Sequence, residues 1–278
     1  MRQWAAKGAA LERYQVELHY SLEAQRKLVR GNLYRALHDA AKEEPFEFKQ
    51  WVRMCTYRFS HQPLNAYGST IGAGGRFNYG DALDNIDSIA FPALYIAENQ
   101  TVAHREYHGY TPTDKRLLTA EEFALTPKKS TAAVYLNGII HNVLDITRPA
   151  KLKPFVNILA DFKIPKQVDM LARSAGLTPR DLIMTTDLFS LSIHEENWRG
   201  WPRQHGIPAN CQLFGKLAWE ADFDAILYRS TKGGGRCLAV FPQNLDKSES
   251  RIWLHDTPPP NVVEVLDASN WQMATTPG

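Results

Sequence analysis

The sequence predicts an α+β protein. Helical patterns cover residues 1–45 and 151–190, strand patterns occur at 223–230 and 237–241, and no regular βαβ spacing connects them. Helices and strands without that spacing are typical of an α+β domain rather than a doubly wound one. The chain has 278 residues, of which 44% are hydrophobic. This is enough to bury one large core, or one core with a small insert.

Composition excludes several functional classes. Charged residues make up 22% of the chain and the net charge is +2, which gives no electrostatic footprint for DNA or an anionic membrane. The three cysteines, Cys55, Cys211 and Cys237, are far apart and form no C-x-x-C pair, so neither a disulfide framework nor a zinc site is expected. Residues 1–30 lack an apolar signal core, and no run approaches the roughly 18 apolar residues of a membrane span. We therefore expect a cytoplasmic protein.

The N-terminal region, residues 1–48, is predicted as a helical extension. Leu18 and Leu22, and then Leu33 and Leu37, fall at i,i+4 spacing between polar residues, which is the spacing of one helix face. We expect two helices that pack on the body of the protein or present a surface to a partner.

The region from residue 50 to 108 changes character. TYRFSH at 56–61 alternates like a strand, with Arg58 on the face opposite Tyr57 and Phe59. A loop at 65–85 contains five glycines, and a short apolar run at 91–99 ends in Asn99. Asparagine is a favoured N-cap, so a helix over 100–108 is predicted.

The rest of the main domain, predicted over 49–268, contains a helical insert at about 150–195. Before it, residues 131–147 are predicted as one or two strands with a possible turn at Asn137-Gly138. Within the insert, one helix should end at Gly176 and another should start at Thr178, with Pro179 as its first helical residue. A helix around 211–221, a hairpin formed by 223–230 and 237–241, and a last strand at 261–267 follow. We expect residues 269–278 to be a flexible tail.

Glu106 is the first residue whose position suggests chemistry. Val102, Ala103 and Glu106 share one face of the predicted helix, so the carboxylate should face inward with the small apolar side chains. A buried carboxylate needs a partner, and arginine suits it. The alternative is an ordinary surface glutamate.

Three further residues suggest a binding site for a phosphate-containing ligand. Arg58 is flanked by aromatic residues, and Arg76 stands in the glycine-rich loop, where backbone N–H groups could approach a phosphate. Ser230 ends a strand just before Gly233-Gly234-Gly235, at a sheet rim. For the arginines, the alternatives are a strand-edge salt bridge and a solvated loop position; for Ser230, the alternative is a turn residue.

Four segments, in order, resemble the RES domain family. They are YRF at 57–59, GGRFNYG at 74–80, ALYIAENQTVAHRE at 93–106 and FDAILYRSTKGGGRCLAVFPQNL at 223–245. The family is named for an Arg, a Glu and a Ser, which match Arg58 or Arg76, Glu106 and Ser230. Phe77 stands where the family usually has Trp. The N-terminal extension and the long gap between Glu106 and Ser230 are additional to the short members.

The resemblance implies a fold similar to that of ADP-ribosyltransferases and an enzyme that consumes NAD as its substrate, with no separate cofactor. Such proteins are typically toxins whose antitoxins carry a helix-turn-helix (Xre-like) domain. The implied reaction is cleavage of the nicotinamide–ribose bond by hydrolysis or phosphorolysis. Transfer of ADP-ribose to a protein and an inactive NAD-binding or partner-binding scaffold are the alternatives. The resemblance does not determine the oligomeric state, and a homodimer is one alternative.

The residues can be given roles that agree with this chemistry. Glu106 would stabilise positive charge on the ribose and hold a hydroxyl. Arg58 and Arg76 would grip the pyrophosphate. Phe77 and Tyr95 could pack on the nicotinamide ring, and Ser230 could orient Glu106 or the ribose. This set of residues needs no metal.

Two other patterns suggest different functions. His104 and His108 flank Glu106 at i,i+4 spacing, but the order H-R-E-Y-H is not the zincin motif, so surface histidines are favoured. Residues 169–183 have the rhythm of a helix-turn-helix unit. Asp169 and Asp181 oppose Arg173 and Arg180 there, so a helical hairpin is favoured over DNA binding.

Overall fold

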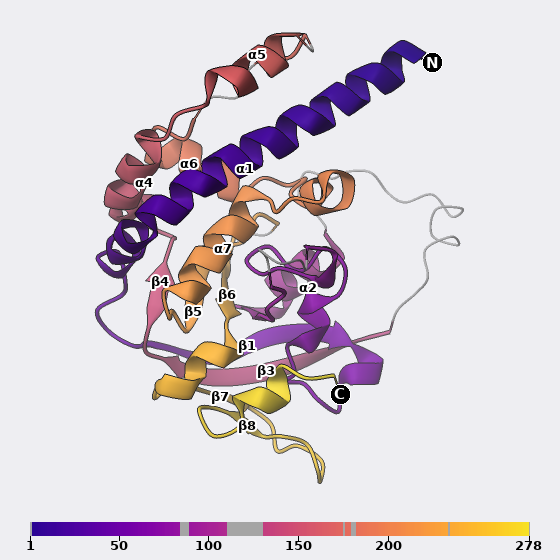
Figure 1. Ribbon diagram of the computed structural model, residues 1–278. Coiled ribbons are helices and arrows are strands. Elements are labelled where there is room, and N and C mark those ends of the chain that lie inside the picture. Colours follow the sequence, from indigo (N-terminus) through magenta and orange to yellow (C-terminus); the bar gives the residue numbers. More distant parts are fainter. Residues whose placement is uncertain are drawn as a thin grey trace. The chain divides into compact units, whose positions relative to one another are not determined.

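The computed structural model describes residues 2–83, 89–109, 130–174, 176–178, 182–232 and 234–277. The chain divides into two compact units. Figure 1 shows the helices and strands of the chain, coloured in sequence order. Unit 1 consists of Met1–Ala40, Gly72–Ala90 and Arg148–Leu217, and unit 2 consists of Ala41–Ile71, Phe91–Thr147 and Ala218–Gly278. Each unit is therefore built from three separate stretches of chain.

Unit 2 contains one eight-stranded mixed sheet in the order β4-β5-β6-β2-β1-β3-β7-β8. All neighbouring strands are antiparallel except β4 and β5, which are parallel. With the helices of the chain, this sheet confirms the predicted α+β class. The strands are β1 (Phe46–Thr56), β2 (Leu94–Ala97), β3 (Thr131–Ile140), β4 (Val143–Asp145), β5 (Ala225–Arg229), β6 (Arg236–Val240), β7 (Arg251–Leu254) and β8 (Val265–Leu266).

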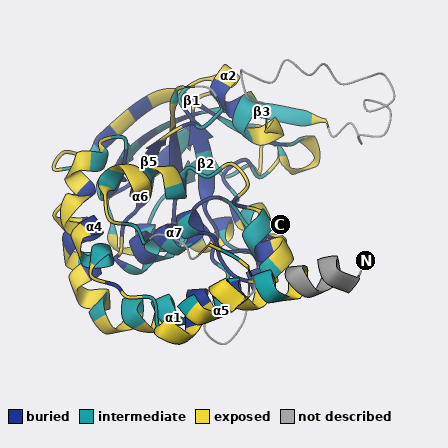
Figure 2. Ribbon diagram, turned by 90° about the horizontal axis from the view of Figure 1, so that it is seen from above, coloured by how far each residue is buried: buried dark blue, intermediate teal, exposed yellow. Residues whose placement is uncertain are grey.

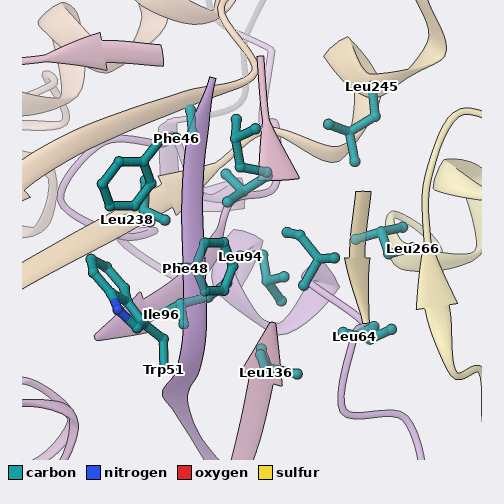
Figure 3. Packing of buried hydrophobic residues seen from close by; sticks show 14 of the residues in the cluster. Phe46, Phe48, Trp51, Leu64, Leu94, Ile96, Leu136, Leu238, Leu245 and Leu266 are labelled. Carbon is teal, nitrogen blue, oxygen red and sulfur yellow. The ribbon is translucent and has the colours of Figure 1, made fainter. Parts of the chain in front are cut away.

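The core of unit 2 packs against β1. Figure 3 shows Phe46, Phe48 and Trp51 of this strand among leucine and isoleucine side chains from neighbouring strands. The Trp51 ring centroid lies 5.5 Å from that of Phe46 and 5.4 Å from that of Phe48. A register shift between Phe48 and Trp51 interrupts the β1–β3 pairing, and this bulge lets all three aromatic side chains enter the core.

Gly138 has a role different from the predicted one. The turn expected at Asn137-Gly138 is wrong, because β3 continues through both residues to Ile140. A Cβ atom at Gly138 would lie 2.5 Å from the Phe48 ring. The glycine therefore makes room for an aromatic side chain on the paired strand instead of reversing the chain.

Unit 1 contains α1 (Arg2–His38), a single helix where two were predicted. Gly31 does not break it. Tyr14 and Leu18 on α1 pack with Val168 and Ala172 of α5, and Figure 2 shows exposed residues along the other side of α1. The other helices of unit 1 are α4 (Lys153–Ala160), α5 (Lys166–Ser174), α6 (Thr186–Ile193) and the first part of α7 (Asn210–Glu220). The residues predicted as an N-terminal extension and as an insert thus pack together in one unit.

Several predicted boundaries change. Residues 57–59 form a 3-10 turn after β1, not a strand, because β1 ends its pairing with β3 at Thr56. The helix predicted from Thr178 falls partly on 179–181, outside the described residues, and residues 182–184 are not helical. The last strand, predicted over 261–267, is β8 and covers only Val265–Leu266. The C-terminal residues differ from a flexible tail: the Ala66 N–H donates to the Ala274 carbonyl at 2.8 Å, and Trp271–Ala274 form a 3-10 turn.

Within the described residues, no helix has the length and apolar character required to cross a membrane.

Candidate active site

Helix α2 (Gln100–His108) carries Glu106 in unit 2. The predicted cap is confirmed, because the Asn99 side chain accepts a hydrogen bond from the Val102 N–H at 3.0 Å. Gly109 ends the helix in the left-handed conformation. Val102 and Ala103 are buried, and Glu106, on the same helical face, is half-buried. The carboxylate therefore faces the protein, as its spacing predicted.

The loop between β5 and β6 brings Ser230 to Glu106. The Ser230 N–H donates to the Gly235 carbonyl at 2.8 Å, which closes the loop. The Ser230 hydroxyl donates to Glu106 Oε1 at 2.5 Å and accepts from the Lys232 N–H at 3.0 Å. Because the Ser230 oxygen accepts a hydrogen bond from the Lys232 N–H, the hydroxyl proton is directed to the Glu106 carboxylate. This short contact has the length of a charge-assisted O–H···O⁻ bond.

Gly235 allows this loop to lie directly on α2. A Cβ atom at this position would lie 2.6 Å from Val102 Cγ2 and 3.5 Å from Glu98 Oε2. The first distance is far shorter than ordinary van der Waals contact, so a larger residue would push the loop away from the helix. The approach of loop and helix therefore depends on the missing side chain.

An ion pair fixes the other end of the same loop. Arg236 Nη2 lies 2.7 Å from Glu98 Oε1, and the Arg236 backbone N–H donates to Glu98 Oε2 at 2.9 Å. The hydrogen bond from the Arg236 side chain lowers the pKa of Glu98, and the same bond raises the pKa of Arg236. This pair holds the start of β6 against the end of β2, two residues before α2 begins.

The end of β1 contacts the last turn of α2. The Thr56 hydroxyl and the Tyr107 hydroxyl are 2.9 Å apart, within hydrogen-bond distance. The 3-10 turn that follows Thr56 carries Arg58, which is exposed. Its guanidinium carbon lies 4.5 Å from the centroid of the Phe59 ring. Arg58 thus follows a strand end that contacts the neighbour of Glu106 in sequence.

The family model described as the RES domain matches residues 50–258, which is more than half of the chain. The chain belongs to the RES domain family. The match contains Arg58, Arg76, Glu106 and Ser230, and it leaves α1 outside. Within this RES chain, the structure brings together two of these residues, Glu106 and Ser230, by a direct hydrogen bond.

A comparison with solved structures finds a similar chain. It belongs to the crystal structure of the M. tuberculosis MbcT–MbcA toxin–antitoxin complex, with a TM-score of 0.40 and 17% sequence identity, covering 88% of the present chain and 97% of that chain. A comparison with curated proteins finds no match.

Arg76 lies in unit 1, whereas the other RES residues lie in unit 2. Its side chain is buried, and Nη1 donates to the carbonyls of Ile193 and Glu195, each at 3.1 Å. Phe77 is completely buried. Arg76 therefore forms hydrogen bonds within unit 1 and Phe77 is buried there, and the contacts of both residues with a ligand stay predictions.

The glycine-rich loop around Arg76 is packed on its own backbone. A Cβ atom on Gly74 would lie 2.4 Å from the Gly80 backbone nitrogen. Gln212 of α7 donates to the carbonyls of Ala73 and Asn78 at 2.7 and 3.1 Å. The close contact between Gly74 and Gly80 accounts for these two glycines without a phosphate.

Tyr95 lies in the middle of β2, paired with Ala239 of β6, and is half-buried. His104 and His108 are exposed, with ring centroids 4.4 Å apart. Burial, and then the neighbouring His104, lower the pKa of His108. In the part of the chain that the structure describes, no three His, Cys, Asp or Glu residues are grouped as metal ligands.

Sequence reasoning missed Glu98, Gly235 and Arg236. Their signal is positional: Ala97 pairs with Cys237, so the next pair outward is Glu98 and Arg236. Only the pairing of β2 with β6 shows that Glu98 and Arg236 are neighbours, because these residues are far apart in the sequence.

Proposed function

We propose that this RES domain cleaves the nicotinamide–ribose bond of NAD, as a toxin-like enzyme that depletes the dinucleotide. Support comes from the family and from one contact above all, the hydrogen bond from the Ser230 hydroxyl to Glu106 Oε1 at 2.5 Å. That bond holds a carboxylate in one orientation on a rigid helix, which is what stabilising a transient positive charge requires.

The proposed reaction uses the carboxylate without a covalent step. The bond between C1′ of the ribose and the pyridinium nitrogen breaks, and its electron pair leaves with nicotinamide, which becomes neutral. The ribose then carries oxocarbenium character, which the negative charge of Glu106 stabilises. An oxygen of a water molecule, or of inorganic phosphate, bonds to C1′ and its proton passes to the solvent, giving ADP-ribose or ADP-ribose phosphorylated at that carbon.

We assign the remaining binding roles within unit 2. Arg58 is an exposed cation near the end of β1, and its planar fork suits the pyrophosphate of NAD. Tyr95 is the aromatic candidate for the nicotinamide ring, and Ser230 orients Glu106. Arg76 and Phe77, which were expected to bind the substrate, are assigned to the packing of unit 1 because of their burial and contacts.

Incubation of the purified protein with NAD tests the proposal. Free nicotinamide should appear, and Glu106→Gln should reduce its release at least about a thousandfold, because the amide carries no charge. Glu47→Gln is the matched control, since Glu47 is exposed on β1. Arg58→Ala should mainly raise the KM for NAD. Near wild-type turnover in Glu106→Gln would refute the assignment.

The products separate the three reactions. ADP-ribose without phosphate dependence indicates hydrolysis, a phosphorylated product that requires inorganic phosphate indicates phosphorolysis, and labelled ADP-ribose on protein indicates transfer. If the protein binds NAD but releases no nicotinamide over hours, an inactive binding scaffold is favoured. A helix-turn-helix antitoxin stays a prediction of the family resemblance, and copurification with a coexpressed neighbouring gene product tests it. A cytoplasmic location stays a prediction of the composition.

A further inference from the structure

The exposed large hydrophobic side chains of unit 2 are mainly aromatic. Among the described residues, those of unit 1 are mostly aliphatic, whereas those of unit 2 include Tyr57, Phe59, Tyr67 and Tyr107. Three of these four aromatic residues follow the end of β1 closely in the sequence. The fourth, Tyr107, contacts Thr56, the last residue of β1. Exposed aromatic side chains that are grouped in this way are typical of a binding surface.

Arg58 lies within this aromatic group and carries a charge that no neighbouring carboxylate balances. Its guanidinium carbon is 4.5 Å from the centroid of the Phe59 ring. It forms no hydrogen bond or ion pair with the part of the chain that the structure describes. A guanidinium that stacks on an aromatic face keeps the N–H groups along its edge for other partners. Arg58 therefore presents donors to an anionic ligand, which is the pyrophosphate of NAD in the proposed function.

Tyr57, directly before Arg58, combines a fixed backbone with an open side chain. Its N–H donates to the Ser130 carbonyl at 2.8 Å, and its carbonyl accepts from the Ser60 N–H at 2.9 Å. The side chain is 65% exposed, and neither its ring nor its hydroxyl contacts a partner within the described ranges. An aromatic ring that is held in place and open to solvent is the arrangement on which nucleic-acid-binding proteins stack bases.

Two of the other exposed aromatic residues already have partners. The Arg58 guanidinium lies over the ring of Phe59, and the Tyr107 hydroxyl is within hydrogen-bond distance of the Thr56 hydroxyl. Both side chains are also less exposed than that of Tyr57, at 42% and 39%. Tyr57 therefore offers the most open aromatic surface beside the cation.

We propose that Tyr57 stacks on the adenine of NAD, beside the pyrophosphate that Arg58 binds. A single ribose separates the pyrophosphate from the adenine in NAD, so a ring that stacks on the adenine has to stand next to the pyrophosphate-binding cation. Tyr57 meets this requirement, because consecutive Cα atoms are about 3.8 Å apart. The inference rests on the proposed function and adds a specificity to it: the site prefers dinucleotides to nicotinamide mononucleotide, which has no adenine.

Isothermal titration calorimetry of the full chain with ADP-ribose tests this role, because ADP-ribose contains the adenine and the pyrophosphate but not the bond to nicotinamide. Tyr57→Leu keeps an apolar side chain without an aromatic face and should weaken ADP-ribose binding at least about fivefold, the lower end of the range for stacking of one base. Tyr57→Phe keeps the ring and should bind like the wild type. Tyr20→Leu is the matched control, since Tyr20 is a 52% exposed tyrosine of unit 1.

Nicotinamide release from two substrates separates stacking from a structural role of Tyr57. Tyr57→Leu should raise the KM for NAD by the factor found for ADP-ribose binding, with kcat changed less than about twofold, because the contact is the same in the ground state and the transition state. Its kcat/KM for nicotinamide mononucleotide should stay unchanged. Damage to the fold would instead lower the values for both substrates and the melting temperature.

The proposal is overturned if the wild type does not bind ADP-ribose, if Tyr57→Leu binds it as tightly as the wild type, or if Tyr57→Phe binds it as weakly as Tyr57→Leu. ADP-ribose binding that depends on Tyr57, without any release of nicotinamide, would refute only the proposed cleavage. Release of nicotinamide by Tyr57→Leu with the KM of the wild type would refute only the stacking role.

Discussion

The substitution Gly235→Ala should separate the loop that carries Ser230 from helix α2. The added Cβ would lie 2.6 Å from Val102 Cγ2, whereas ordinary contacts between carbon atoms are about 3.5–4.0 Å. Relief of this overlap requires a displacement of about 1 Å. The same displacement would stretch the bond between Ser230 Oγ and Glu106 Oε1 from 2.5 Å to a length at which little of it is left.

The expected loss follows from that bond. A hydrogen bond to a charged group contributes about 1.5–3 kcal/mol, and about 1.4 kcal/mol corresponds to tenfold in rate. Gly235→Ala should therefore reduce kcat/KM for nicotinamide release by about 10- to 100-fold. Ser230→Ala, which removes the hydroxyl itself, should cause a loss of similar size.

A compensating change makes this prediction specific. Val102→Ala removes the methyl group that the new Cβ would meet, so the double variant Gly235→Ala/Val102→Ala should recover most of the activity. Val102→Ala alone is the control for the cavity that it creates, and melting temperatures separate loss of activity from loss of fold. Equal activities in the single variant Gly235→Ala and in the double variant would refute the argument that this overlap sets the position of Ser230.

Three further predictions concern stability. The pKa of His19 is about 4 in the folded protein and 6.5 in the unfolded chain. The unfolded state binds more protons between these values, so the free energy of unfolding should fall by up to about 2 kcal/mol as the pH falls from 7 to 5. In His19→Leu, the urea midpoint should depend less on pH over this range. Arg76→Met should lower the melting temperature by the equivalent of about 2–4 kcal/mol, since two carbonyls lose their donor; an unchanged melting temperature with a raised KM for NAD would return Arg76 to substrate binding. Asn99→Ala should lower the free energy of unfolding, measured with a denaturant, by about 1 kcal/mol, because α2 loses its N-cap. An unchanged free energy of unfolding would show that the cap is dispensable.

The sequence predicted local features well where one short segment determines them. The cap at Asn99, the inward face of Glu106 and the hairpin formed by β5 and β6 each depend on neighbouring residues, and the structure has all three. It predicted poorly where distant segments decide. Gly138 was predicted as a turn residue, because its actual role depends on the ring of Phe48 on another strand, which the local sequence does not show. Residues 57–59 alternate like a strand, but the pairing of β1 with β3 has already ended at Thr56.

Long-range contacts are also the reason that Arg58 and Arg76 could not be distinguished from the sequence. Both are arginines in segments that match the family, and a glycine-rich loop is a plausible phosphate site when its own packing is unknown. The contacts on which we base the different proposed roles are long-range: the carbonyls of Ile193 and Glu195 that accept from Arg76 follow it by more than a hundred residues. Arg58 instead follows β1, whose end contacts Tyr107 beside Glu106.

The two additions to the chain, the N-terminal helix and the insert, are better understood as one structural feature. Leu18 packs with Val168 and Ala172, and Gln25 donates to the Lys163 carbonyl and accepts from the Lys163 N–H, both at 2.9 Å. Neither segment could bury its apolar face alone, because an isolated amphipathic helix gains most of its stability from packing.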